Sequence, residues 1–242
     1  MDAYDLWAAV YDTDGNVLQQ LDDLYVDAQL PYLLPPGSSL MIAEFGCGTG
    51  RNTIKLARRG AQVLAVDYSQ GMLGKLKGKA KEKNVEDRIH VYQQDLALFP
   101  KGPDGTDSGF KQALDRSYSG GVDGVVSTLV IEHLDINLFF AAVKAILKPE
   151  GWLLLTNMHA DMGAISSAGF LDPETGKKIK PASINHPEQE ILEAAGKYGF
   201  VLRGEVSEDG PRDAEHAKQF GKRAVKWIGI KMHIGMVLKL RY

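Results

Sequence analysis

Three glycines at alternate positions mark the part of this sequence best suited to ligand chemistry. Gly46, Gly48 and Gly50 lie in the segment Glu44–Gly50, which reads EFGCGTG. Because glycine has no Cβ and adopts dihedral angles that other residues resist, such a run lets backbone approach a ligand closely. The GxGxG spacing differs from the GxGxxG spacing that places a pyrophosphate on a helix N-terminus. The loop predicts contact with a nucleotide-like molecule, with a flexible turn as the alternative.

Two acidic residues follow the next apolar segments. Asp67 comes 21 residues after Gly46, where nucleotide-binding α/β folds place the carboxylate that accepts hydrogen bonds from ribose hydroxyls. Asp95 could accept from the exocyclic amino group of adenine, or it could cap a helix instead. The side chains that could enclose an adenine ring are Tyr68, Met72 and Leu96.

An alternating pattern of apolar segments and helical stretches must position these residues. The predicted strands are Leu40–Phe45, Gln62–Val66, Arg88–Gln94, Val122–Ser127 and Trp152–Asn157. The predicted helices between them are Arg51–Arg59, Gly71–Lys83 and Asn137–Leu147. This alternation predicts an α/β fold, a doubly wound parallel sheet with helices on both faces. Ligands bind such sheets at the carboxyl ends of the strands, which is where the glycine loop and both acids lie.

The remaining segments extend this framework into one predicted domain, residues 1–242, with an N-terminal helical cap at 1–37. After the fifth strand we expect a helix at Ile191–Tyr198 and strands at Phe200–Val206 and Trp227–Leu240. Lys101–Gly121 is expected to be a surface excursion around a short helix at Phe110–Tyr118. Ala160–Pro187 is expected to be a lid-like insertion, in which Leu171–Ile179 forms a tight turn between two extended pieces.

Composition narrows the class of function. The 31 acidic and 28 basic residues give a net charge of −3, so no overall positive field favours nucleic acid as a partner. Cys47 is the only cysteine, which excludes an intrachain disulfide and fits a reducing compartment. No secretory signal, membrane span or familiar metal-ligand spacing is recognisable. We expect a cytoplasmic protein without a metal site, and the sequence does not indicate its oligomeric state.

Four motifs in order resemble the class I S-adenosylmethionine-dependent methyltransferases. They are Glu44–Gly50, Ala65–Leu73, Gln94–Leu96 and Val126–Leu134. The resemblance implies a Rossmann-like, seven-stranded sheet that is mostly parallel with its last strand antiparallel. It also implies S-adenosyl-L-methionine as cofactor and methyl transfer as the reaction.

A narrower resemblance points to fungal small-molecule methyltransferases related to gliotoxin bis-thiomethyltransferase. It is carried by Trp7–Asn16, Gly50–Thr53 and Met162–Lys180. It implies a thiol of a secondary metabolite as acceptor, and it brings Tyr11 and Asn52 to the cofactor, although Tyr11 could simply pack its helix. The complete set assigned to the cofactor site is Tyr11, Glu44, Gly46, Cys47, Gly48, Gly50, Asn52, Asp67, Tyr68, Met72, Asp95, Leu96 and Ser127.

Histidines after the fourth and fifth strands are the candidate catalytic residues. His133 comes first and His159 second, because a thiol or phenol acceptor would benefit from a base near the methyl group. Each could instead pack or cap locally, and Glu132 could orient His133 or only begin a helix. Oxygen or nitrogen acceptors remain alternatives, as do a non-catalytic cofactor-binding regulator and a nicotinamide-dependent oxidoreductase.

Overall fold

A single mixed sheet organises the computed structural model, which describes residues 3–102, 105–118, 120–167, 169–172 and 175–241. The order of its strands is β3-β2-β1-β4-β5-β10-β8, and β9 also pairs with β10. The strands are β1 (Met41–Phe45), β2 (Gln62–Asp67), β3 (Ile89–Gln93), β4 (Val122–Thr128), β5 (Leu147–Met158), β8 (Phe200–Leu202), β9 (Ser207–Asp209) and β10 (His233–Leu240). The first five are parallel to one another and β10 is antiparallel to β5. The predicted Rossmann-like topology is confirmed.

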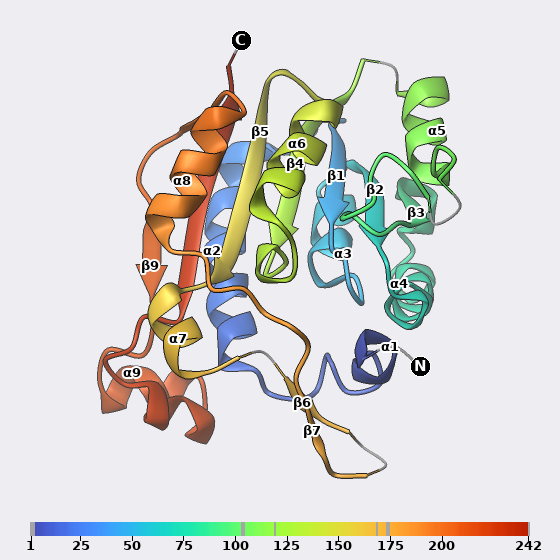
Figure 1. Cartoon of the computed structure of the whole chain (residues 1–242). Helices are drawn as coiled ribbons and strands as arrows, with labels where there is room; N and C mark the ends of the chain where they lie inside the picture. The colour runs from blue at the N-terminus through green and yellow to red at the C-terminus, as the bar shows by residue number, and fades with distance from the viewer. Residues whose placement is uncertain (1–2, 103–104, 119, 168, 173–174, 242) are drawn as a thin grey trace.

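Helices cover both faces of the sheet (Figure 1). On one face lie α5 (Gly109–Ser117), α6 (Ile136–Ile146) and α8 (Glu188–Lys197). On the other lie α2 (Val17–Leu33), α3 (Arg51–Arg58) and α4 (Gln70–Glu82). Strand residues alternate between the two cores: Ala43 and Phe45 face the first, and Ile42 faces the second. A sheet buried on both faces explains the continuous apolar strands of the sequence.

Smaller elements gather at the carboxyl ends of the parallel strands, at the bottom of Figure 1. They are α1 (Ala3–Trp7), η2 (Ile131–His133), α7 (Ala160–Ile165), α9 (Ala214–Gln219), η3 (Lys222–Trp227) and a hairpin of β6 (Phe170–Leu171) and β7 (Lys178–Ile179). A further 3₁₀ turn, η1 (Glu86–Arg88), precedes β3. The hairpin confirms the two extended pieces expected here, although Pro173 of the expected turn lies outside the described residues. No helix of the described ranges is long and apolar enough to cross a membrane.

Three expectations need correction. The segment 101–121 is not only a surface excursion, because α5 buries Phe110 and Leu114 in the core. Of the strand expected at Phe200–Val206 only Phe200–Leu202 (β8) forms; Gly204 follows it in the left-handed region at a φ of +81°, and β9 begins only at Ser207. The strand expected from Trp227 begins only at His233, since η3 and a turn at Gly229 (φ +83°) occupy the preceding residues.

Candidate active site

The glycine loop connects β1 to α3 with all three glycines in the left-handed region, at φ values of +71°, +53° and +90°. A Cβ on Gly46 would lie 2.3 Å from a methyl carbon of Val130, and a Cβ on Gly50 would lie 2.3 Å from Cδ1 of Leu76. A Cβ on Gly48 would have no heavy atom of the described residues within 4 Å, its chain neighbours aside. Packing therefore requires the first and third glycines, while the middle one faces open space.

Asp67, at the end of β2, is held against this loop by backbone hydrogen bonds. Its Oδ2 accepts from the Gly48 N–H at 2.8 Å and its Oδ1 from the Ser69 N–H at 2.9 Å. Burial raises the pKa of Asp67, and these backbone hydrogen bonds oppose that rise. Each carboxylate oxygen has a second lone pair, so the oriented group can still accept from a ligand.

A cavity of about 480 Å³, called here the strand-end cleft, opens beside the loop and Asp67. The residues of the sequence-based cofactor set that line it are Tyr11, Gly46, Gly48, Asp67, Tyr68, Met72, Asp95 and Leu96. The lining residues that the sequence did not single out are Ala3, Tyr4, Gln94, Ala97, Thr128, Leu129, Val130, Leu134, Pro181 and Ala182. His133 lines it too.

Five residues of the predicted cofactor set do not line the cleft: Glu44, Cys47, Gly50, Asn52 and Ser127. Glu44 is buried behind the loop, where it accepts a hydrogen bond from Thr53 and where burial raises its pKa to about 8. The amide of Asn52 donates to Oγ1 of Thr128 at 3.0 Å. The hydroxyl of Ser127 donates to the carbonyl of Phe45 at 3.2 Å. Glu44, Asn52 and Ser127 thus form hydrogen bonds behind the cleft, whereas Cys47 and Gly50 belong to the glycine loop itself without lining the cleft.

Two carboxylates bind residues 3–14 to the rest of the protein beside the cleft. Asp5 accepts from the hydroxyl of Ser69 at 2.6 Å. Asp12 accepts from the hydroxyl of Thr49 at 2.6 Å and pairs with Lys79, also at 2.6 Å. These bonds join the N-terminal segment to the glycine loop and to α4. They position the two aromatic side chains of this segment that line the cleft, Tyr4 and Tyr11.

His133 lies at the border between the strand-end cleft and a second cavity. Its Nδ1 is 2.8 Å from the carbonyl oxygen of Ala182, and its Nε2 is 3.5 Å from Oε1 of Glu132. A carbonyl only accepts hydrogen bonds, so Nδ1 must carry a proton and Nε2 faces the carboxyl group. Burial raises the pKa of Glu132, and the charge of His133 lowers it. Nε2 of His133 and the buried carboxyl group of Glu132 therefore face each other at this border.

The second cavity, of about 120 Å³, is called here the inner chamber. It lies between α1, β5, α7, η3 and the β6–β7 hairpin. Four residues line both cavities: Tyr4, Tyr11, Leu129 and His133. Leu129 has a φ of +59° in the turn after β4. The two cavities thus adjoin at the end of β4, with a histidine at their border.

Comparisons with known proteins decide the family. A model described as a methyltransferase domain matches residues 43–153. An uncharacterized methyltransferase of Emericella nidulans is 36% identical over 264 residues, covering 98% of this chain and 89% of that relative. The chain belongs to the class I S-adenosylmethionine-dependent methyltransferases.

Other relatives agree with this family. The magnesium-protoporphyrin O-methyltransferase of Synechocystis is 33% identical over 82% of each chain. The structure of a geranyl diphosphate C-methyltransferase of Streptomyces coelicolor, in complex with S-adenosyl-L-homocysteine, shares the fold. Its TM-score is 0.61 at 14% identity, and the match covers 91% of this chain and 76% of that one.

The strand-end cleft of this methyltransferase fits S-adenosylmethionine, its cofactor. Gly48 leaves open space beside the loop and Asp67 presents an oriented acceptor. Gln94 lines the same cleft, and its buried Oε1 has no hydrogen-bond partner within the described part of the chain. A cleft of this size with a few fixed polar groups is typical of cofactor sites.

The second histidine predicted to be catalytic has a structural role in the methyltransferase. His159 is the N-cap of α7, where its Nδ1 accepts from the N–H of Asp161 at 3.0 Å. Its Nε2 lies 2.7 Å from Oε1 of Glu208, and it lines neither cavity. We correct its assignment to helix capping.

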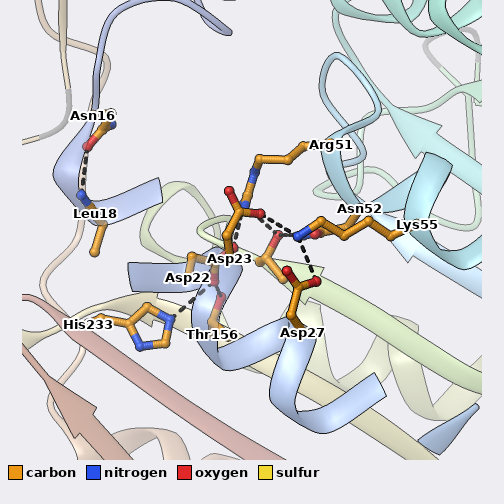
Figure 2. A network of polar contacts seen from close by, with 11 residues as sticks. Asn16, Leu18, Asp22, Asp23, Asp27, Arg51, Asn52, Lys55, Thr156 and His233 are labelled. Atoms are coloured by element: carbon orange, nitrogen blue, oxygen red, sulfur yellow. Dashed lines mark hydrogen bonds and ion pairs between the residues drawn. The ribbon is translucent and has the colours of Figure 1, made fainter. Parts of the chain in front are cut away.

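A buried polar network ties α2 to α3 and to the far strands, as Figure 2 shows. Asp22 is fully buried and pairs with Arg51, the first residue of α3. It also accepts from the hydroxyl of Thr156 and lies 3.2 Å from Nε2 of His233. Burial raises the pKa of Asp22, but Arg51 and His233 outweigh it and bring the value to about 2. The network fixes the helix that follows the glycine loop.

Proposed function

We propose that this methyltransferase transfers a methyl group to a thiol of a small molecule bound in the inner chamber. The observation that carries the proposal is the adjacency of the two cavities, which share a border at His133. The choice of a thiol rests on a resemblance to fungal small-molecule methyltransferases related to gliotoxin bis-thiomethyltransferase, which is carried by Trp7–Asn16, Gly50–Thr53 and Met162–Lys180. S-adenosylmethionine supplies an activated methyl group, so this chain must chiefly orient the acceptor and receive its proton.

Residues of the strand-end cleft would hold the cofactor. Asp67 would accept from the ribose hydroxyls, because backbone already orients its carboxylate. Asp95 or Gln94 would accept from the adenine amino group, and Met72 and Leu96 would enclose the ring. Residues 3–14 would act as a cap on this cleft, since Asp5 and Asp12 fasten them to it.

The Glu132–His133 pair would receive the proton that the acceptor loses. Nδ1 of His133 is occupied by Ala182, so the free proton site lies between Nε2 and Oε1 of Glu132. A thiol that transfers its proton to this pair becomes a thiolate, which is the form that attacks a methyl group. Both residues line the inner chamber, so no distant relay is required.

Oxygen is the second candidate acceptor atom. It is favoured by the 33% identity to a magnesium-protoporphyrin O-methyltransferase over 82% of each chain. A hydroxyl has a higher pKa than a thiol and would depend more strongly on the Glu132–His133 pair. Removal of the base, the Glu132–His133 pair, should therefore lower turnover more for a hydroxyl acceptor than for a thiol acceptor.

A methylation screen with labelled S-adenosylmethionine tests the proposal. The panel would contain matched aryl thiols, phenols and anilines of similar volume. We expect transfer to thiols first and to phenols second. Transfer only to anilines would refute a base-dependent acceptor. Tight binding of S-adenosylhomocysteine without turnover of any acceptor would favour a regulatory protein instead.

A further inference from the structure

The inner chamber combines an apolar wall with positive charge. The wall is formed by buried side chains from three parts of the chain, Met158, Met162, Trp227 and Met232. Methionine side chains adapt to irregular shapes, and a tryptophan face offers a flat apolar surface. Such a wall suits a flat or aromatic body.

Three basic residues line the same chamber. Lys178 comes from β7, whereas Arg223 and Lys226 come from η3. Arg223 donates a hydrogen bond to the backbone carbonyl of Asp14, and its charge also opposes the rise in the pKa of Asp14 that burial causes. Arg223 is thus engaged by Asp14, one of the two described acidic residues that line the chamber; the other is Glu132.

The two lysines, Lys178 and Lys226, do not have such a contact with an acidic residue. None of the ion pairs within the described residues includes Lys178 or Lys226. Nζ of Lys226 lies 4.7 Å from the centroid of the Trp227 ring, so its charge stands beside the apolar wall. Both lysines are exposed and line the chamber from separate elements, and within the described residues neither forms an ion pair with the acidic residues that line it, Asp14 and Glu132.

The second acidic residue of the chamber, Glu132, lies next to His133, which borders the strand-end cleft. Glu132 is buried there with His133 as its neighbour. A negatively charged group on a ligand would be repelled by Glu132 and attracted by the lysines. A ligand with one anionic group would thus be oriented with its other end toward His133.

We propose that the methyl acceptor is an amphipathic anion, a small aromatic or apolar molecule that carries a carboxylate or sulfonate group. Lys178 and Lys226 bind the anionic group, the methionine and tryptophan wall binds the body, and the reacting atom lies toward His133. This inference rests on the proposed function, because it takes the inner chamber as the acceptor site. It adds that the acceptor molecule carries a negative charge, which the choice of a sulfur or oxygen acceptor atom does not determine.

Binding of three matched probes tests the charge requirement without any turnover. Calorimetry on the protein saturated with S-adenosylhomocysteine would compare 2-naphthoate, 2-naphthalenemethanol and 2-naphthylmethylammonium. We expect 2-naphthoate to bind about tenfold more tightly than the neutral alcohol, with the cation weakest. In the double variant Lys178→Gln/Lys226→Gln this preference should disappear.

A charge-matched control separates local recognition from net charge. Lys177 and Lys222 are exposed, as the two chamber lysines are, and lie close to them in the sequence, but they do not line the chamber. The variant Lys177→Gln/Lys222→Gln should keep the preference for 2-naphthoate. Equal binding of the three probes, no binding of any at millimolar concentration, or equal loss in both variants would overturn the inference. Anion-selective binding without methylation of any thiol would instead count against the proposed function alone.

Discussion

The backbone N–H of Gly48 donates a 2.8 Å hydrogen bond to Oδ2 of Asp67. The two residues come from different strand ends, and this bond makes them one unit. The glycine supplies space for a ligand and the carboxylate supplies an acceptor whose direction is already fixed. A ligand that uses both need not reorganise either, which lowers the free-energy cost of binding.

Substitution Asp67→Ala should therefore weaken the binding of S-adenosylhomocysteine. It removes the carboxylate that we propose as acceptor for the ribose and the hydrogen bond to Gly48, so we expect a loss of about 10- to 100-fold in affinity. Calorimetry measures the dissociation constant directly. Asp87→Ala, at an exposed position of η1, is the control and should leave the affinity unchanged. Equal affinities for the two variants would mean that Asp67 does not bind the ribose.

Substitution His133→Asn should separate catalysis from the structure of the site. The asparagine amide can still donate to the carbonyl of Ala182, but it cannot take a proton. We expect kcat with a thiol acceptor to fall about 100-fold, while the affinity for S-adenosylhomocysteine stays within a few-fold. His90→Asn, on β3 and outside both cavities, should retain kcat. Wild-type kcat in His133→Asn would exclude the histidine as the base.

Glu44 should make the folded protein less stable as the pH rises. Burial raises its pKa from 4.5 to about 8, so between these values the folded state holds a proton that the unfolded state has lost. Its stabilising contribution is complete below the unfolded value and is lost as pH rises through about 8. Glu44→Gln should retain on the order of 3 kcal/mol more of its unfolding free energy between pH 5 and 8 than the wild type does. Denaturant titrations at both pH values measure this difference, and parallel pH profiles would contradict the raised pKa.

Substitution Asp22→Asn should destabilise the fold much more than Asp23→Asn, one position along α2. Asp22 is fully buried and bound to Arg51, so its loss leaves the guanidinium with only the partly exposed Asp23 as an ion-pair partner. We expect a cost of about 3 to 5 kcal/mol in unfolding free energy. Asp23 also pairs with Arg51 but its side chain is 36% exposed, so its substitution should cost less than about 1 kcal/mol. Urea denaturation compares the two, and similar costs would show that the buried network contributes little.

Asp22 should also set how the wild type responds to acid. Its pKa of about 2 lies below the ordinary value of 3.8, so its contribution is present above 3.8 and is lost as pH falls toward 2. Asp22→Asn should therefore lose less of its remaining stability over this acidic range. This window does not overlap the one assigned to Glu44.

The parts of the fold and site that depend on local patterns could be predicted from the sequence. The strand-loop-helix around Gly48 and the acid at Asp67 are each encoded within a few residues. Contacts between residues far apart in the sequence could not be predicted from such local patterns. His159 is bound by Glu208, 49 positions away, and Ala182 reaches His133 over the same separation. Their pairing depends on how the chain returns to the sheet, which no local spacing shows.

The burial of α5 could have been predicted from the sequence. Phe110 and Leu114 are one helical turn apart, and that spacing predicts a buried face. The flanking residues are rich in glycine and aspartate, a composition that is typical of a surface loop. Glu44 and Ser127 were assigned to the cofactor because they belong to motifs that carry contact residues. Alternation along a strand directs neighbouring side chains to opposite faces, so membership of a motif does not imply contact with the ligand.

We expect the strand-end cleft to bind the cofactor with its sulfur toward the inner chamber. A crystal structure of the protein with S-adenosylhomocysteine tests it most directly. We expect the ribose hydroxyls on Asp67, the adenine between Met72 and Leu96, and the sulfur at the border formed by Leu129 and His133. A ligand bound outside the cleft, or one whose sulfur points away from the chamber, would show that the inner chamber does not receive the methyl group.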